Sequence, residues 1–247
     1  MQTKQVYEYK AWDLPVRLFH WINFTTIIML IFFGLVMLFK KELGIEGVEA
    51  KINLKVMHVT IGYVFVTNLV IRFLWGFIGN RHARWRTLIP SRGHMEKVRA
   101  HKESIRQGTP LQYTGHNPLG QIAATIIFLC LLVMAVTGLI RAGTDIYYPP
   151  FGSIAAEYVA LPGVDPSTLV PYDKSAVDTE KFDELKAFKK PFGTIHIYTS
   201  YFLMFLIIVH IGAVVHAEVR QGGSIISAMF TGRKYLSEKS SDPDDQT

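Results

Sequence analysis

The chain contains one cysteine among its 247 residues. A single cysteine excludes a disulfide within the chain, an iron–sulfur cluster held by several cysteines, and a cofactor attached covalently through a C-x-x-C-H motif. Cys130 lies in the middle of an apolar stretch, where a thiol packs as a small apolar group. Any redox cofactor of this protein is therefore held without a covalent bond to cysteine.

Acidic residues are missing from the four longest apolar runs, which cover residues 18–39, 56–78, 119–140 and 194–217. Each run has about 20 residues or more, the length that an α-helix needs to cross about 30 Å of hydrocarbon. Without carboxylates at this depth, and without any Glu-x-x-His pair in the chain, a carboxylate-based metal site is excluded. The sequence predicts an all-α integral membrane protein whose four transmembrane helices form a bundle.

Four histidines lie within these runs or at their ends: His20, His58, His196 and His210. Titratable side chains at membrane depth are costly, so they usually mark function. His196 and His210 are separated by about four turns of the predicted fourth helix. On one helix this spacing brings them within about 40° of the same face and about 21 Å apart along the axis. We predict two stacked, non-covalent haem b groups, each with its iron held by two histidines.

Basic residues are concentrated in residues 79–118, where eight lysines and arginines accompany two glutamates. Cytoplasmic loops carry an excess of Lys and Arg. We therefore expect a multi-pass protein of the bacterial inner membrane, with this loop and both termini cytoplasmic and residues 141–190 periplasmic. A basic segment between membrane spans does not indicate nucleic-acid binding. We expect His82, His94 and His101 in this loop to be solvated, and residues 237–247 to form a disordered tail.

This orientation predicts which histidines form pairs. His20 begins the first span and His210 approaches the end of the fourth, so both lie toward the cytoplasm. The second and fourth spans start at the periplasm, where His58 and His196 lie. Depth therefore pairs His20 with His210 and His58 with His196.

Glycines and one arginine share the spacing of the histidines. Gly34 follows His20 by the same interval that separates His196 from His210, and Gly62 follows His58 by one helical turn. Glycine lets a flat macrocycle approach the backbone, although close packing between helices is an equal alternative. Arg72 follows His58 by the same interval that separates His196 from His210. It is a candidate partner for a haem propionate, with an arginine that extends to the membrane surface as the alternative.

Bis-histidine iron has no open position, which favours electron transfer over substrate chemistry at the metal. His116, next to the third span, is a candidate contact for a quinone head near the cytoplasmic haem. Asp13 has an ordinary alternative as the cap of the first helix, and the segment from Gly115 to Pro118 as a helix entry. The polar candidates for this quinone site are Asp13, Arg17, Arg72, His116, Asn117 and Glu218.

Several segments together resemble the b-type cytochrome subunits of nickel–iron hydrogenases, within the bacterial cytochrome b-561 group. They are residues 12–21 (WDLPVRLFHW), Met57-His58 with Gly62, residues 72–81 (RFLWGFIGNR), residues 115–121 (GHNPLGQ), His196 to His210, and residues 229–232 (MFTG). The resemblance implies a four-helix anchor for two b haems, with His20, His58, His196 and His210 as ligands.

The resemblance also implies electron transfer from a periplasmic catalytic subunit to membrane quinone. Residues 141–190 are long for such subunits, so the periplasmic partner is either a hydrogenase-like enzyme or a c-type cytochrome. The chain is then an electron-transfer subunit of an oxidoreductase, with quinone reductase or quinol oxidase activity and a homo-oligomer as open alternatives. The competing interpretation is a haem-free transporter or proton relay that uses the same histidines.

Overall fold

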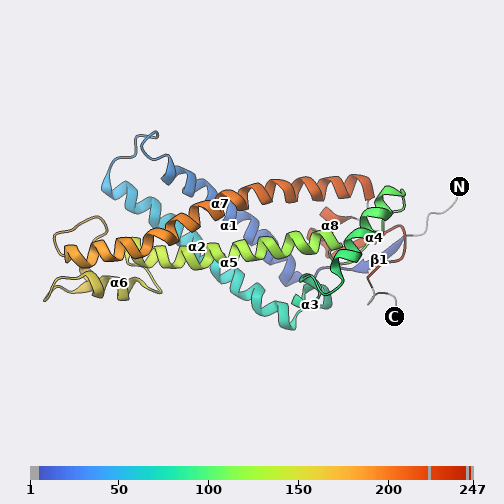
Figure 1. Ribbon diagram of the computed structural model, residues 1–247, viewed down its shortest axis with the longest axis horizontal. Coiled ribbons are helices and arrows are strands. Elements are labelled where there is room, and N and C mark those ends of the chain that lie inside the picture. Colours follow the sequence, from blue (N-terminus) through green and yellow to red (C-terminus); the bar gives the residue numbers. More distant parts are fainter. Residues whose placement is uncertain (1–5, 222–223, 243–244, 246–247) are drawn as a thin grey trace. The chain divides into compact units, whose positions relative to one another are not determined.

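The fold is built on four long helices, which a computed structural model describes within residues 6–221, 224–242 and 245 (Figure 1). They are α1 (Leu14–Leu38), α2 (Val48–Ile78), α5 (Pro118–Ile146) and α7 (Thr179–Gln221). All four are long and apolar enough to cross a membrane, and only 6% of the apolar window of α1 is buried inside the protein. Apolar side chains that face outward need a lipid environment. The prediction of an all-α integral membrane fold is confirmed.

The helices extend beyond the apolar runs of the sequence. Helix α2 begins at Val48 rather than near residue 56, and α7 begins at Thr179 rather than near residue 194. Backbone hydrogen bonds continue through polar turns as readily as through apolar ones, so hydropathy identifies the lipid-facing part of a helix and not its ends. Pro191 lies inside α7 without ending it.

The chain divides into two compact units, and each long helix contributes a stretch to both. Unit 1 comprises Met1–Ile22, Asn68–Leu129 and Met204–Thr247. Unit 2 comprises Asn23–Thr67 and Cys130–Leu203. His20 and His210 belong to unit 1, and His58 and His196 belong to unit 2. Each predicted ligand pair therefore lies within a single unit.

Unit 1 contains a two-stranded sheet that hydropathy did not predict. Strand β1 (Tyr7–Lys10) pairs antiparallel with β2 (Arg233–Leu236), with Tyr7 opposite Leu236. The short helix α8 (Ile225–Thr231) precedes β2 and ends at Gly232, whose φ of 81° favours glycine. The carbonyl of Gly232 accepts hydrogen bonds from the N–H groups of Ala11 (2.9 Å) and Trp12 (3.1 Å).

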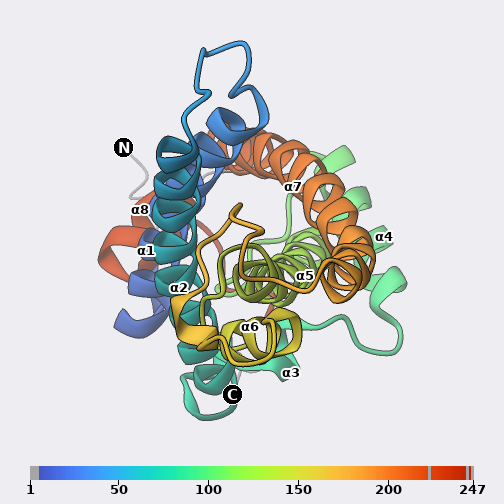
Figure 2. The ribbon, with the colours of Figure 1, turned by 90° about the vertical axis from the view of Figure 1, so that its left-hand side faces the viewer.

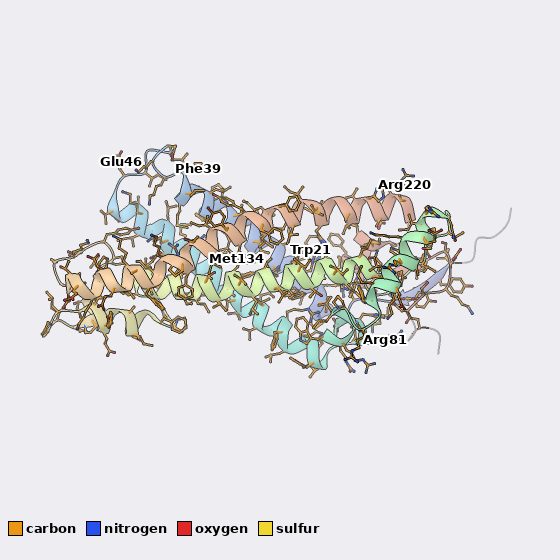
Figure 3. All side chains as sticks on the ribbon, in the orientation of Figure 1. Trp21, Phe39, Glu46, Arg81, Met134 and Arg220 are labelled. Carbon is orange, nitrogen blue, oxygen red and sulfur yellow. The ribbon has the colours of Figure 1, made fainter. Side chains whose placement is uncertain are left out.

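The start of α1 is held by the C-terminal part of α8 and by Gly232. The indole N–H of Trp21, labelled in Figure 3, donates to the carbonyl of Met229 at 3.0 Å. Arg17 donates to the carbonyl of Phe230. A Cβ at Gly232 would meet the carbonyl oxygen of Trp12. The WDLPVRLFHW and MFTG segments thus form one contact, although they lie near opposite ends of the sequence.

The basic connection of unit 1 folds into short helices: η1 (Arg81–Ala83), α3 (Trp85–Leu88) and α4 (His94–Arg106). The prediction that its histidines are solvated is wrong, because His82, His94 and His101 are all buried. His94 Nε2 contacts the carbonyl oxygen of Pro118 at 2.8 Å. The rings of His82 and His101 pack edge-on against aromatic side chains, Trp12 and Tyr113 respectively. A count of charges along the chain does not detect such local packing.

Within unit 1, the described part of the C-terminal tail contacts the basic connection, which differs from the predicted disorder. Ser240 is 1% exposed, and its hydroxyl oxygen lies 3.0 Å from the hydroxyl oxygen of Thr114. The carboxylate of Asp242 accepts from the N–H of Gly115 at 2.8 Å. Asp245 forms an ion pair with Arg81, labelled in Figure 3. The polar composition of the tail suggested a solvated segment, but Ser240 and Asp242 accept hydrogen bonds from the backbone N–H groups of Thr114 and Gly115.

Unit 1 buries the charged side chain of Lys234, whose ammonium donates to the carbonyls of Tyr113 (3.1 Å) and Gly115 (2.8 Å). Burial lowers the pKa of Lys234 to about 8 from 10.5, although Asp242 and Glu218 act in the opposite direction. Between pH 8 and 10.5 the unfolded chain therefore binds more protons than the folded chain, so folding stability rises with pH through this window.

We expect Lys234→Met to remove this rise in stability, which corresponds to about 3 kcal/mol over the full difference between the two pKa values. The measurement is thermal unfolding in detergent across this pH range, with Lys174→Met, at an exposed site, as the control. Equal pH dependence in the wild type and Lys234→Met would contradict the prediction.

In unit 2, the connection between α5 and α7 forms a small folded cap. Helix α6 (Gly152–Val159) lies next to the end of α5, as Figure 2 shows. A Cβ at Gly152 would collide with the backbone of Tyr147, so glycine permits this close approach. The 3₁₀ turn η2 (Pro166–Thr168) follows α6. The apolar core of the cap consists of Ala155, Val159, Val177 and Leu185.

Candidate functional site

Unit 2 brings together His58 from α2 and His196 from α7. Their ring centroids are 6.4 Å apart, with an angle of 69° between the ring planes. Two metal–imidazole bonds of about 2 Å, plus about 1 Å from each nitrogen to its ring centre, make about 6 Å. The two rings therefore have the separation at which one iron ion fits between them. A bis-histidine haem is compatible with this pair, and the assignment of the two residues as ligands stays a prediction.

Helix α5 supplies the support for His196. The hydroxyl oxygen of Thr137 lies 2.8 Å from Nδ1 of His196, and the same hydroxyl donates to the carbonyl of Val133 at 2.7 Å. With its hydrogen committed to Val133, Thr137 accepts from Nδ1–H, and this leaves Nε2 of His196 free to bind a metal. The next residue is Gly138, where a Cβ would lie 3.5 Å from the His196 ring. Thr137 has no periodic or charge signal, and the sequence analysis did not identify it.

We expect Thr137→Val to weaken haem binding at this pair by about 10- to 100-fold, the usual cost of removing a partner that orients a ligand. The measurement is haem retention by the purified protein during dilution against a haem-binding competitor. Thr60→Val is the control, because the Thr60 hydroxyl is exposed and donates only to its own helix, at the carbonyl of Val56. Equal retention by both variants would contradict the role of Thr137.

The glycines that share the histidine spacing have different surroundings. A Cβ at Gly34 would lie 3.7 Å from Cε1 of His58, so α1 passes directly beside this ring. A Cβ at Gly62 would meet nothing within 4 Å. Gly76, by contrast, makes room for the indole of Trp85 and therefore serves helix packing. A haem contact for Gly34 and Gly62 stays a prediction.

In unit 1, His20 lies on α1 and His210 on α7. His20 packs edge-on against the indole of Trp21, with centroids 5.3 Å apart. His116 lies within electrostatic range of both His210 and Arg72. The two histidines that were paired by their expected depth, His20 and His210, thus lie in the same unit. Their role as ligands stays a prediction.

Arg72 does not extend to the surface, because its side chain is buried within unit 1. Its guanidinium lies 5.1 to 5.9 Å from the ring centres of three aromatic residues, Phe19, Trp85 and Phe128. Nη2 donates to the carbonyl of Ala83 at 2.9 Å, while Nη1 is buried without a hydrogen-bond partner. A buried cation with an unpaired donor fits a carboxylate ligand such as a haem propionate.

Most of the other polar candidates already have structural roles. Asp13 caps α1 through the N–H of Val16 (3.2 Å), so the ordinary alternative holds for this residue. Asn117 accepts from the N–H of Gly120 at 2.7 Å at the start of α5. Glu218 accepts from the N–H of Ile225 at 2.6 Å and thereby positions α8.

His116 differs from these capping residues because its ring packs against an aromatic side chain. The centroids of His116 and Trp12 are 4.9 Å apart. Burial, together with the nearby charges of Lys234 and Arg72, lowers the pKa of His116 to about 3. The imidazole is therefore neutral at physiological pH, and its two nitrogens offer one donor and one acceptor.

The comparison with protein families decides the class of this chain. The prokaryotic cytochrome b561 family matches residues 11–232, which include all four histidines of the two pairs. The chain belongs to the prokaryotic cytochrome b561 family. As a b-type cytochrome it carries haem b, so the predicted resemblance to this group and the predicted cofactor type are confirmed.

Relatives of this cytochrome carry names that agree with the family. A probable Ni/Fe-hydrogenase B-type cytochrome subunit of Rhizobium leguminosarum bv. viciae is 28% identical, over 97% of this chain and 92% of the relative. A protein of the same name from Bradyrhizobium diazoefficiens is 29% identical, over 94% of this chain and 86% of the relative. One from Azotobacter vinelandii is 35% identical, over 54% of this chain and 58% of the relative. No solved structure matches the chain significantly.

Proposed function

We propose that this cytochrome is a di-haem electron conduit of the bacterial inner membrane. It exchanges electrons between a periplasmic redox partner and the quinone pool. The observation that carries the proposal is the His58–His196 pair, whose 6.4 Å centroid separation suits one iron ion. Haem b bound there supplies one-electron redox chemistry at iron.

The proposal of two haems rests on two histidine pairs within one chain. Helix α7 is continuous from Thr179 to Gln221 and carries one member of each pair, with about four helical turns between them. Helices α1 and α2 supply the other members, His20 and His58. Each pair would hold the iron of one haem through two imidazoles and would leave no place for substrate at the metal. This favours electron transfer over oxygen or substrate chemistry at the metal.

The cap between α5 and α7 is the proposed docking region for the partner. We place it in the periplasm because the basic connection of residues 79–118 favours the cytoplasmic side. The partner is a hydrogenase-like enzyme, since the relatives are named as subunits of Ni/Fe hydrogenases. A c-type cytochrome is the alternative partner. The complete oxidoreductase thus requires a further subunit.

Quinone exchange is proposed for unit 1, on the cytoplasmic side. Of the polar candidates there, His116 retains a neutral imidazole and lies within electrostatic range of His210 and Arg72. A neutral imidazole can accept a proton from a quinol oxygen or donate a hydrogen bond to a quinone oxygen. His116 is therefore the residue proposed to contact the quinone head.

The deciding experiment is the haem content of the protein purified in detergent from cells with ample haem. Reduced-minus-oxidised spectra and a pyridine haemochrome assay should give two haem b groups per chain. One haem would contradict the di-haem arrangement. A folded, colourless protein would overturn the conduit and favour a transporter or proton relay based on the same histidines.

A further inference from the structure

Unit 2 contains a pocket of about 340 Å³ between α5 and α7. Four of the side chains around it are basic and one is acidic. The lining residues are Arg141, Asp145, Lys186, Lys189, Lys190, Gly193, Thr194 and Ile197. A pocket with this excess of positive charge suits an anionic ligand.

Positive charge exceeds negative charge most clearly around Asp145, whose side chain is 11% exposed. Its carboxylate oxygens lie 2.7 Å from Nη2 of Arg141, 2.8 Å from Nζ of Lys189 and 3.6 Å from Nζ of Lys55. One carboxylate thus faces three cations that are partly withdrawn from water. Cations in such a position are stabilised by further negative charge, which no other residue lining this pocket supplies.

The pocket adjoins the histidine pair of the same unit. Thr194 and Ile197 lie on either side of His196 in the sequence. Arg141 follows Thr137, the residue that contacts His196, by one turn of α5. A Cβ at Gly138, three residues before Arg141 on the same helix, would lie 3.5 Å from the His196 ring. A ligand that reaches from the histidine pair into the pocket would therefore have Arg141 among its neighbours.

Gly193 is the residue that lets Arg141 lie at this position. A Cβ at Gly193 would collide with the guanidinium, so any larger residue would displace it. The position of Arg141 thus depends on the local sequence of α7 as well as on its own helix. This close fit distinguishes Arg141 from a lysine on an open surface.

We propose that Arg141 and Lys189 bind the propionate carboxylates of the haem held by His58 and His196, with Asp145 holding both cations in place. The inference rests on the proposed function, because it requires a haem at this pair. Arg141 offers paired N–H donors that match a carboxylate, and Lys189 adds a second, compact cation. Lys55 adds further positive charge on the Asp145 side.

This arrangement predicts a direction for the reduction potential of that haem. Positive charge beside the propionates favours the reduced iron, which carries one positive charge less than the oxidised iron. Removing Arg141 or Lys189 therefore lowers the potential, and removing the negative charge of Asp145 raises it. A unit charge acting across roughly 12 Å at an effective dielectric constant of about 20 changes the redox equilibrium about tenfold. For a one-electron couple this is a shift of about 59 mV.

The test is a redox titration of the purified holo-protein, after its haem content has been measured. The variants are Arg141→Gln, Lys189→Gln and Asp145→Asn. The haem in question is the one that is absent when His196 is replaced. Lys174→Gln is the matched control, because it removes the same charge from an exposed site of unit 2. Infrared difference spectra with isotope-labelled propionates report direct contact, because loss of the arginine shifts the carboxylate bands.

We expect Arg141→Gln and Lys189→Gln to lower the potential of this haem alone, Asp145→Asn to raise it, and Lys174→Gln to leave both haems unchanged. Lys189→Gln retains the Arg141–Asp145 pair, so it tests the inference even where Arg141→Gln fails to fold. Unchanged potentials in both cation variants, shifts confined to the other haem, or unchanged propionate bands in Arg141→Gln overturn the inference. A wild-type protein without haem overturns the proposed function and this inference together, and the haem assay detects that outcome before any titration.

Discussion

Replacing His196 with alanine should reduce the haem content of the protein from two haems per chain to one. The ring of His196 faces His58 across 6.4 Å, and no other histidine contacts that ring among the described residues. Without His196 the iron would be held by one imidazole instead of two, which removes a large part of the binding energy of a non-covalent haem. The measurement is the pyridine haemochrome assay on detergent-purified protein, with the visible spectrum of the remaining haem.

The pairing makes this prediction specific, because His58→Ala should remove the same haem. His20→Ala and His210→Ala should each remove the other one. The matched control is His216→Ala on the same helix, since His216 is exposed and belongs to neither pair. If His196→Ala retains both haems, the ligand assignment is wrong. If it loses both haems while its elution in size-exclusion chromatography is unchanged, the assignment to separate pairs is wrong.

The helices and the proximity of His58 to His196 were predictable because both follow from local composition. An apolar run of about 20 residues has one stable conformation in a bilayer, which is a helix that satisfies its own backbone hydrogen bonds. The positions of His58 and His196 relative to their run ends then fix their depth. The sequence therefore predicted a pair that the structure brings to 6.4 Å.

Contacts between distant segments were not predictable from the same signals. Thr137 supports His196 through one hydroxyl, and a threonine in an apolar helix has no periodic signal for such a role. The pairing of β1 with β2 joins strands of four residues each from distant parts of the chain, too short for an alternation pattern to be read. His82, His94 and His101 are buried by packing against partners that the charge of their segment conceals.

Asp13 accepts hydrogen bonds from three separate places in unit 1, so its replacement should lower stability strongly. One carboxylate oxygen caps α1 through the N–H of Val16. The other accepts from the indole N–H of Trp75 at 2.9 Å and from the backbone N–H of Asn80 at 3.2 Å. A single side chain thus joins the start of α1 to the end of α2 and to the residue that precedes η1.

We expect Asp13→Ala to lower the free energy of unfolding by about 3 kcal/mol. Loss of the helix cap contributes about 1 kcal/mol. The two part-buried donors that lose their acceptor contribute about 1 kcal/mol each. For a domain of this size the melting temperature falls by about 10 °C.

Thermal unfolding in detergent, monitored by far-UV circular dichroism, measures this loss of stability. A matched control shows how much of the loss comes from removing one negative charge alone. Asp173→Ala removes a carboxylate that accepts from the N–H of Ser175 in an exposed turn. It should change stability by less than about 0.5 kcal/mol. Asp13→Asn keeps one acceptor oxygen and should fall between the two. If Asp13→Ala melts with the control but loses quinone turnover, then Asp13 belongs to the quinone site and its hydrogen bonds contribute little to the stability of unit 1.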